Sequence, residues 1–99
     1  METRTYSEPV QVFNAGRELI GTALFTGKAT RHIKSWSWAG WLEDLSCDIV
    51  NGQDLVLGFD QGAVRLATCT AVVNRTKKDR PPQVQALVQG SDLPPDVSA

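Results

Sequence analysis

The sequence predicts an all-β fold, and three observations support that prediction. No segment shows the long apolar period of 3.6 residues that marks an amphipathic helix. Six segments alternate apolar with polar side chains between turn residues, as strands do. Three of them contain an internal glycine (Gly21, Gly40 and Gly58), and such glycines often mark bends at barrel corners. We therefore expect a small antiparallel β-barrel of SH3-like or split-barrel type, with a β-sandwich as the alternative.

The N-terminal half contains three of the expected strands, at residues 10–13, 19–26 and 33–42. Turns at residues 14–17 and 26–28 end the first and the second of these strands, because Asn and Gly supply permissive backbone there. The C-terminal half begins with a polar connection over residues 43–53, which ends in an Asn-Gly turn signal. A hairpin over residues 54–73, a charged loop over 74–82 and a short strand over 84–88 complete the expected order.

The hairpin carries the strongest local pattern in the chain. Leu57 belongs to a run of alternating apolar residues, and Gln61-Gly62 then interrupts that alternation. If Gln61-Gly62 forms a two-residue loop, Leu57 faces Leu66 in the core. A slip of one residue would set Leu57 against Arg65, so this register is a specific prediction.

Length and composition bound the organisation of the chain. Its 99 residues, 41% hydrophobic and 21% charged, suit one ordinary globular domain. We expect that domain over residues 8–90, with a flexible N-terminus at residues 1–7. Residues 91–99 contain two prolines and little apolar bulk, and we expect a disordered tail there.

Charge and hydropathy argue against several locations and partners. The net charge of -1 gives no global attraction to nucleic acid or to an anionic membrane. No apolar run is long enough for a membrane-spanning helix, and the start METRTYSEP lacks the apolar region of a signal peptide. We therefore expect a cytoplasmic protein with no membrane partner, in which Cys47 and Cys69 are free thiols.

Few residues offer catalytic or metal chemistry. The single histidine and the lack of a C-x-x-C pair argue against a metal site and against a bound cofactor. Cys69 lies in an apolar strand, where a thiol packs as a small hydrophobic group. Cys47 lies beside acidic residues that disfavour its thiolate. We expect no enzyme activity and no catalytic residue.

Two features suggest binding instead. Alternation places Trp36 and Trp38 on one face of the third expected strand and Trp41 on the other, so we expect Trp41 at a contact surface. Two basic segments, residues 28–34 and 75–80, hold seven of the ten Lys and Arg residues. If they lie at one end of a barrel, they would form a cationic patch for single-stranded nucleic acid. The candidate residues for that patch are Lys28, Arg31, Lys34, Lys77, Lys78 and Arg80.

Residues 43–59, EDLSCDIVNGQDLVLGF, include a segment that resembles part of the PilZ domains, bacterial receptors for cyclic di-GMP. In that family D-x-S-x-x-G precedes a strand, and Asp44 and Ser46 match this pattern. Ile49 stands where the family has glycine, and no R-x-x-x-R motif lies upstream. The match covers only a few residues, so we assign the chain to no family.

Together these observations predict a non-catalytic binding or assembly module that contacts a protein partner or another copy of itself. The alternative is a nucleic-acid-binding β-barrel that uses the two basic segments.

Overall fold

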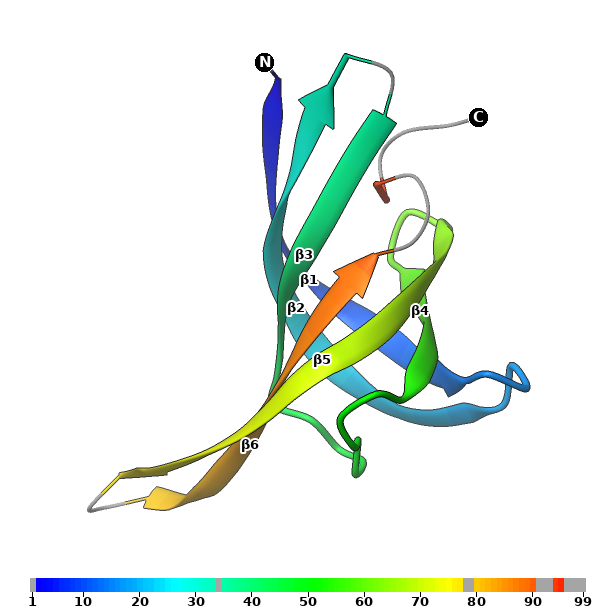
Figure 1. Ribbon diagram of the computed structural model, residues 1–99. Helices are drawn as coiled ribbons and strands as arrows, with labels where there is room; N and C mark the ends of the chain where they lie inside the picture. The colour runs from blue at the N-terminus through cyan, green and yellow to red at the C-terminus, as the bar shows by residue number, and fades with distance from the viewer. Residues whose placement is uncertain (1, 34, 78–79, 91–93, 96–99) are drawn as a thin grey trace.

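The computed structural model shows one antiparallel sheet of six strands closed into a ring (Figure 1). It describes residues 2–33, 35–77, 80–90 and 94–95, with backbone only at 75–77 and 80–82. The strands are β1 (Thr3–Asn14), β2 (Leu19–His32), β3 (Ser35–Glu43), β4 (Asp54–Phe59), β5 (Val64–Lys77) and β6 (Arg80–Gly90). None of the described residues lies in a helix, so the all-β prediction is confirmed.

The ring consists of two meanders of three strands, β1–β2–β3 and β4–β5–β6. Antiparallel pairing of β1 with β4 and of β3 with β6 joins the two meanders. The connection over residues 44–53 leads from β3 to β4 and contains no helix or strand. The order of the six strands along the chain also agrees with the prediction, although their ends do not.

Two strands extend into segments that the sequence presents as tail or turn. β1 begins at Thr3 and pairs with β2 from that residue onward, so residues 3–7 belong to the sheet rather than to a flexible N-terminus. β2 continues through Gly27 to His32, so the expected turn at residues 26–28 is wrong. The segment 28–32 is therefore strand rather than an irregular basic loop.

Gly27 does not form a turn; it lets the backbone of β2 lie close to β3 and to the Phe25 ring. Gly27 pairs directly with Gly40 of β3, with no bulge at this position. A Cβ added at Gly27 would lie 2.7 Å from Phe25 Cζ, and one at Gly40 would lie 2.7 Å from Phe25 Cε1. Both glycines therefore leave room for the Phe25 ring, which is the kind of close packing that explains glycine inside a strand.

The register of the β4–β5 hairpin differs by one residue from the prediction. Its loop has three residues, because the Phe59 N–H donates to Ala63 O (2.8 Å) and the Gly62 N–H donates to Phe59 O (2.9 Å). Gly62 has a φ of 94°, as in a turn that ends with a bulge. Leu57 therefore pairs with Arg65, and Leu66 lies on the outer face with 47% of its surface exposed.

The inward side chains of all six strands form one apolar core. Phe25, Trp38 and Phe59 lie at its centre and pack edge to face, with ring centroids 5.6 to 6.3 Å apart. Gly90 of β6 lies against the Trp38 indole, where any Cβ would overlap the ring. The alternation in β3 is confirmed: Trp36, Trp38 and Leu42 face inward, and Trp41 faces outward.

The connection between β3 and β4 covers one end of this core. Ile49 is buried there, whereas its neighbour Val50 is 64% exposed. Ser46 fastens the connection to β2, since its Oγ accepts from the Thr22 N–H (2.8 Å) and its own N–H donates to Thr22 O (3.1 Å). Gly21 leaves the space that this contact needs, because a Cβ there would lie 2.7 Å from Cys47 Sγ.

The expected loop over residues 74–82 and the expected tail also differ from the structure. β5 and β6 continue as a two-stranded arm past the ring, from Val72 to Lys77 and back from Arg80 (Figure 1). Pro94 and Pro95 are buried, which corrects the expectation that both prolines lie in a disordered tail. The rest of that tail, residues 91–93 and 96–99, lies outside the described residues.

The corrected register makes a prediction about two leucines. Leu57→Ala should destabilise the protein by about 2–5 kcal/mol, because Leu57 is fully buried in the core. Leu66→Ala serves as the matched control and should cost at most about 1 kcal/mol, since its side chain is half exposed. Urea denaturation measures both. Equal losses would mean that the two leucines face each other as the two-residue loop requires.

Candidate functional site

A groove on the outer face of the ring contains Trp41. Two rows of neighbouring residues cross the strands there: Ser7, Thr26, Trp41 and Leu87 form one row, and Thr5, Lys28 and Ala39 form the other. These seven residues, with Tyr6, Gly27 and Gly40, line a hollow of about 630 Å³. Four strands, β1, β2, β3 and β6, therefore contribute to one surface.

The shape of this groove follows from the sizes of its side chains. Trp41 is half-buried and lies between Thr26 on one neighbouring strand and Leu87 on the other. The residues beside it are small, and Gly27 and Gly40 add no side chain, so the indole stands next to open space. Lys28 is the one charged residue among those that line the groove. The site is thus a mainly apolar hollow with hydroxyl groups and one ammonium group at its edge.

The groove continues along β3 toward the β2–β3 turn. A second hollow of about 190 Å³ shares Lys28 and Ala39 with the first and adds Thr30, Ser37 and Gln89. Near this end the His32 Nε2 lies 3.3 Å from Ser37 Oγ. Both side chains are exposed, so water competes with this contact and the pair lacks the enclosed setting that activates a serine nucleophile.

The structure separates the two basic segments that the nucleic-acid alternative combines. Lys28 and Arg31 are exposed on β2, where Lys28 lies opposite Ala39 in the middle of β3 and Arg31 lies opposite Trp36 near its start. β6 runs antiparallel to β3, so its beginning extends past the other end of β3. Lys77 and Arg80 therefore lie on the arm, at the opposite end of the molecule (Figure 1). Lys34 and Lys78 lie outside the described residues.

Of the predicted binding residues, the structure brings Trp41 and Lys28 together in the groove. Arg31 lies further along β2, opposite Trp36. The Arg4 guanidinium lies over the Trp36 ring, 5.5 Å from the ring centroid. The described part of the chain thus contains no single surface that joins both basic segments.

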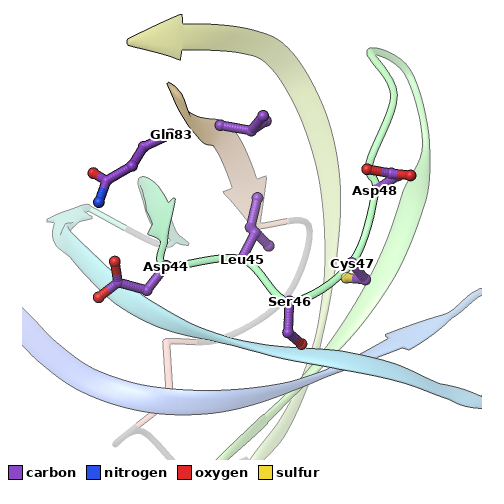
Figure 2. Close-up of a pocket in the computed structure, with 7 residues that line it drawn as sticks. Asp44, Leu45, Ser46, Cys47, Asp48 and Gln83 are labelled. Atoms are coloured by element: carbon purple, nitrogen blue, oxygen red, sulfur yellow. The ribbon is translucent and has the colours of Figure 1, made fainter. Parts of the chain in front are cut away.

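A separate pocket, away from the groove at Trp41 and of about 460 Å³, lies between residues 44–48 and the base of the arm (Figure 2). Figure 2 shows Asp44 near Gln83 at one end and Asp48 at the other, with Cys47 beside Asp48. Burial raises the pKa of the Cys47 thiol, and the charge of Asp48 raises it further. His32 lies at the far end of β2 and is no base for this thiol. Among the described residues, no three His, Cys, Asp or Glu side chains group as a metal ion would need.

Sequence reasoning missed an apolar stripe on the other side of the ring. Leu19, Phe13, Val56 and Leu66 are successive partners across β2, β1, β4 and β5. Leu19 and Leu66 are 57% and 47% exposed. The signal that could have revealed the stripe is the Asp-Gln-Gly loop, because a three-residue loop turns Leu66 outward.

Comparison with known protein families, curated proteins and solved structures found no match to this chain. No helix in the part of the chain that the structure describes is long and apolar enough to cross a membrane.

The raised pKa of Cys47 predicts slow alkylation. Iodoacetamide should modify Cys47 more slowly than free cysteine at pH 8, and the rate should increase only at higher pH, because less thiolate is present at any given pH. Cys69 is buried and should react only on unfolding. Mass spectrometry of the wild type and of Cys47→Ser measures both rates. Rapid labelling of native Cys47 at pH 7 would contradict this description of its surroundings.

Proposed function

We propose that this protein is a non-catalytic binding or assembly module whose outer groove at Trp41 contacts a protein partner or a second copy of the chain. One observation carries the proposal: a half-buried tryptophan on the outside of the ring forms the wall of a hollow of about 630 Å³. The core of the domain is complete without this side chain, because Trp38 and the rings around it fill the interior.

The composition of the groove supports this function. Interfaces combine an apolar centre with a polar rim, and aromatic side chains in pockets contribute much of their binding energy. Trp41 and Leu87 supply the apolar centre, whereas Lys28 and the threonines supply donors and acceptors around it. A partner that inserts an apolar side chain beside the indole would remove both from water, which favours association by about 25 cal/mol per Å² of apolar surface.

The chemistry of the other sites supports a binding role over an enzymatic one. The two thiols have raised pKa values and no imidazole beside them, and the one imidazole–hydroxyl contact is exposed. No charge cluster of one sign joins the two basic segments among the described residues, so we favour a protein partner over nucleic acid.

We further propose that the ring is a small β-barrel of split-barrel or SH3-like type and that it functions in the cytoplasm. The closed order of six strands and the directly opposed Gly27 and Gly40 support the barrel. Strong bending at paired glycines is how small barrels turn their corners.

Substitution of Trp41 tests the proposed function. Trp41→Ala should leave the melting temperature within a few degrees of the wild type and should weaken concentration-dependent association measured by sedimentation velocity. Trp38→Ala is the control and should destabilise the fold by about 3–5 kcal/mol, because that ring fills the core.

The stability of Trp41→Ala and the oligomeric state of the wild type test the role of the groove. If Trp41→Ala unfolds the protein as strongly as Trp38→Ala, the groove is part of the core and the proposal fails. If the wild type is a monomer at every concentration, self-association through the groove is excluded, and either a foreign partner or no partner remains. Salt-sensitive binding of an oligonucleotide in the same experiment would favour the nucleic-acid alternative.

A further inference from the structure

The segment after the last strand packs on the body of the protein. Pro94 is among the most deeply buried side chains of the molecule, and Pro95 is also buried. Both lie beside the turn of the β4–β5 hairpin, close to the end of β6 (Figure 1). This burial is unusual for proline, which is mostly exposed in proteins.

Two side chains of the hairpin hold the backbone of this segment. The Arg65 Nε donates to Pro94 O at 3.2 Å, and the Gln61 Nε2 donates to Pro95 O at 2.9 Å. The Arg65 Nη1 also donates to Val64 O at 2.9 Å, which orients the guanidinium toward the prolines. The carbonyl groups of two successive prolines thus accept from Gln61 in the hairpin loop and from Arg65 at the start of β5.

These contacts define what the site recognises. Among the described residues, it takes a buried proline ring and two consecutive backbone carbonyls. Proline suits such a site because it has no N–H to satisfy and its fixed φ reduces the entropy lost on binding. Recognition of proline-rich segments by a preformed surface is a general mode of peptide binding.

We propose that the β4–β5 hairpin forms a docking site for a Pro-Pro segment of a partner protein and that the chain's own Pro94-Pro95 occupies this site in cis. Gln61 and Arg65 are the residues that bind the segment. The site is separate from the groove at Trp41, which lies on β3, a strand that pairs with neither β4 nor β5. The docking site on the hairpin is therefore independent of the function proposed for the groove at Trp41.

The cis segment regulates this site by competition. Only three residues separate it from Gly90 in the sequence, and a segment of the same chain competes at an effective concentration on the order of millimolar. A free Pro-Pro peptide must compete with that concentration, so the wild type should bind it weakly. Loss of the cis contact should expose the site to a segment supplied in trans.

The test uses the full chain with Pro94→Ser and Pro95→Ser, which removes both proline rings from the cis segment, leaves its backbone carbonyls, and keeps every residue of the site. The probe is a synthetic peptide of residues 91–99, SDLPPDVSA, and the control peptide has both prolines replaced by serine. Isothermal titration calorimetry measures the affinity of each peptide for the substituted chain and for the wild type. Gln61→Ala in the substituted background tests the site, with Gln83→Ala at the opposite end of the molecule as the matched control.

We expect the substituted chain to bind the proline peptide several-fold more tightly than the wild type does, because the cis segment without its proline rings competes less well for the site. The serine peptide should bind at least several-fold more weakly, and Gln61→Ala, but not Gln83→Ala, should reduce the affinity. Equal affinity for both peptides, or no gain over the wild type, would overturn the proposal. If Pro94→Ser with Pro95→Ser unfolds the chain, as circular dichroism would show, the segment is an integral part of the fold and the proposal also fails.

Discussion

The packing of Phe25, Trp38 and Phe59 inside the ring is the interaction on which the rest of the structure depends. Three large rings in edge-to-face contact fill a space that a closed sheet of six strands encloses. Strands β2, β3 and β4 each contribute one ring, so the cluster joins the two meanders. Because the rings are large, backbone must approach them closely, and this explains glycine at positions 27, 40 and 90.

The core residues point into the ring, so the side chains on the outer face are available for binding. Alternation along β3 places Trp38 in the core and Trp41 outside, three residues further on. The same small residues that permit close strand approach leave the hollow beside Trp41. The groove therefore depends on the same glycines that leave room for Phe25, and the indole is the feature that makes it a candidate binding surface.

Much of the fold could be predicted from local sequence, because alternation and turn residues are local signals. Six strands in the correct order, the two faces of β3 and the irregular connection to β4 all follow from them. The turn expected at Gly27 was wrong because the opposing Gly40 is distant in sequence, and only the paired strands show why glycine is needed. The register of the hairpin was wrong because Gln61-Gly62 fits a loop of two or of three residues, and alternation alone does not choose between them.

The candidate sites were predictable to a smaller extent, since they combine residues from separate strands. The outward direction of Trp41 follows from alternation, whereas the groove also requires Leu87 from β6 and Thr5 from β1. Pro94 and Pro95 belong to a polar segment whose composition resembles a tail. Their burial depends on Gln61 and Arg65, about 30 residues earlier in the chain.

Strand β3 presents Trp38 to the closed core and Trp41 to the outside of the ring. Fluorine NMR of the protein labelled with 5-fluorotryptophan measures this arrangement, because each of the three tryptophans gives its own resonance. On transfer from H2O to D2O, we expect the Trp41 resonance to shift while the Trp38 resonance stays in place. A solvent shift of Trp38 as large as that of Trp41 would show that Trp38 is not enclosed in the core.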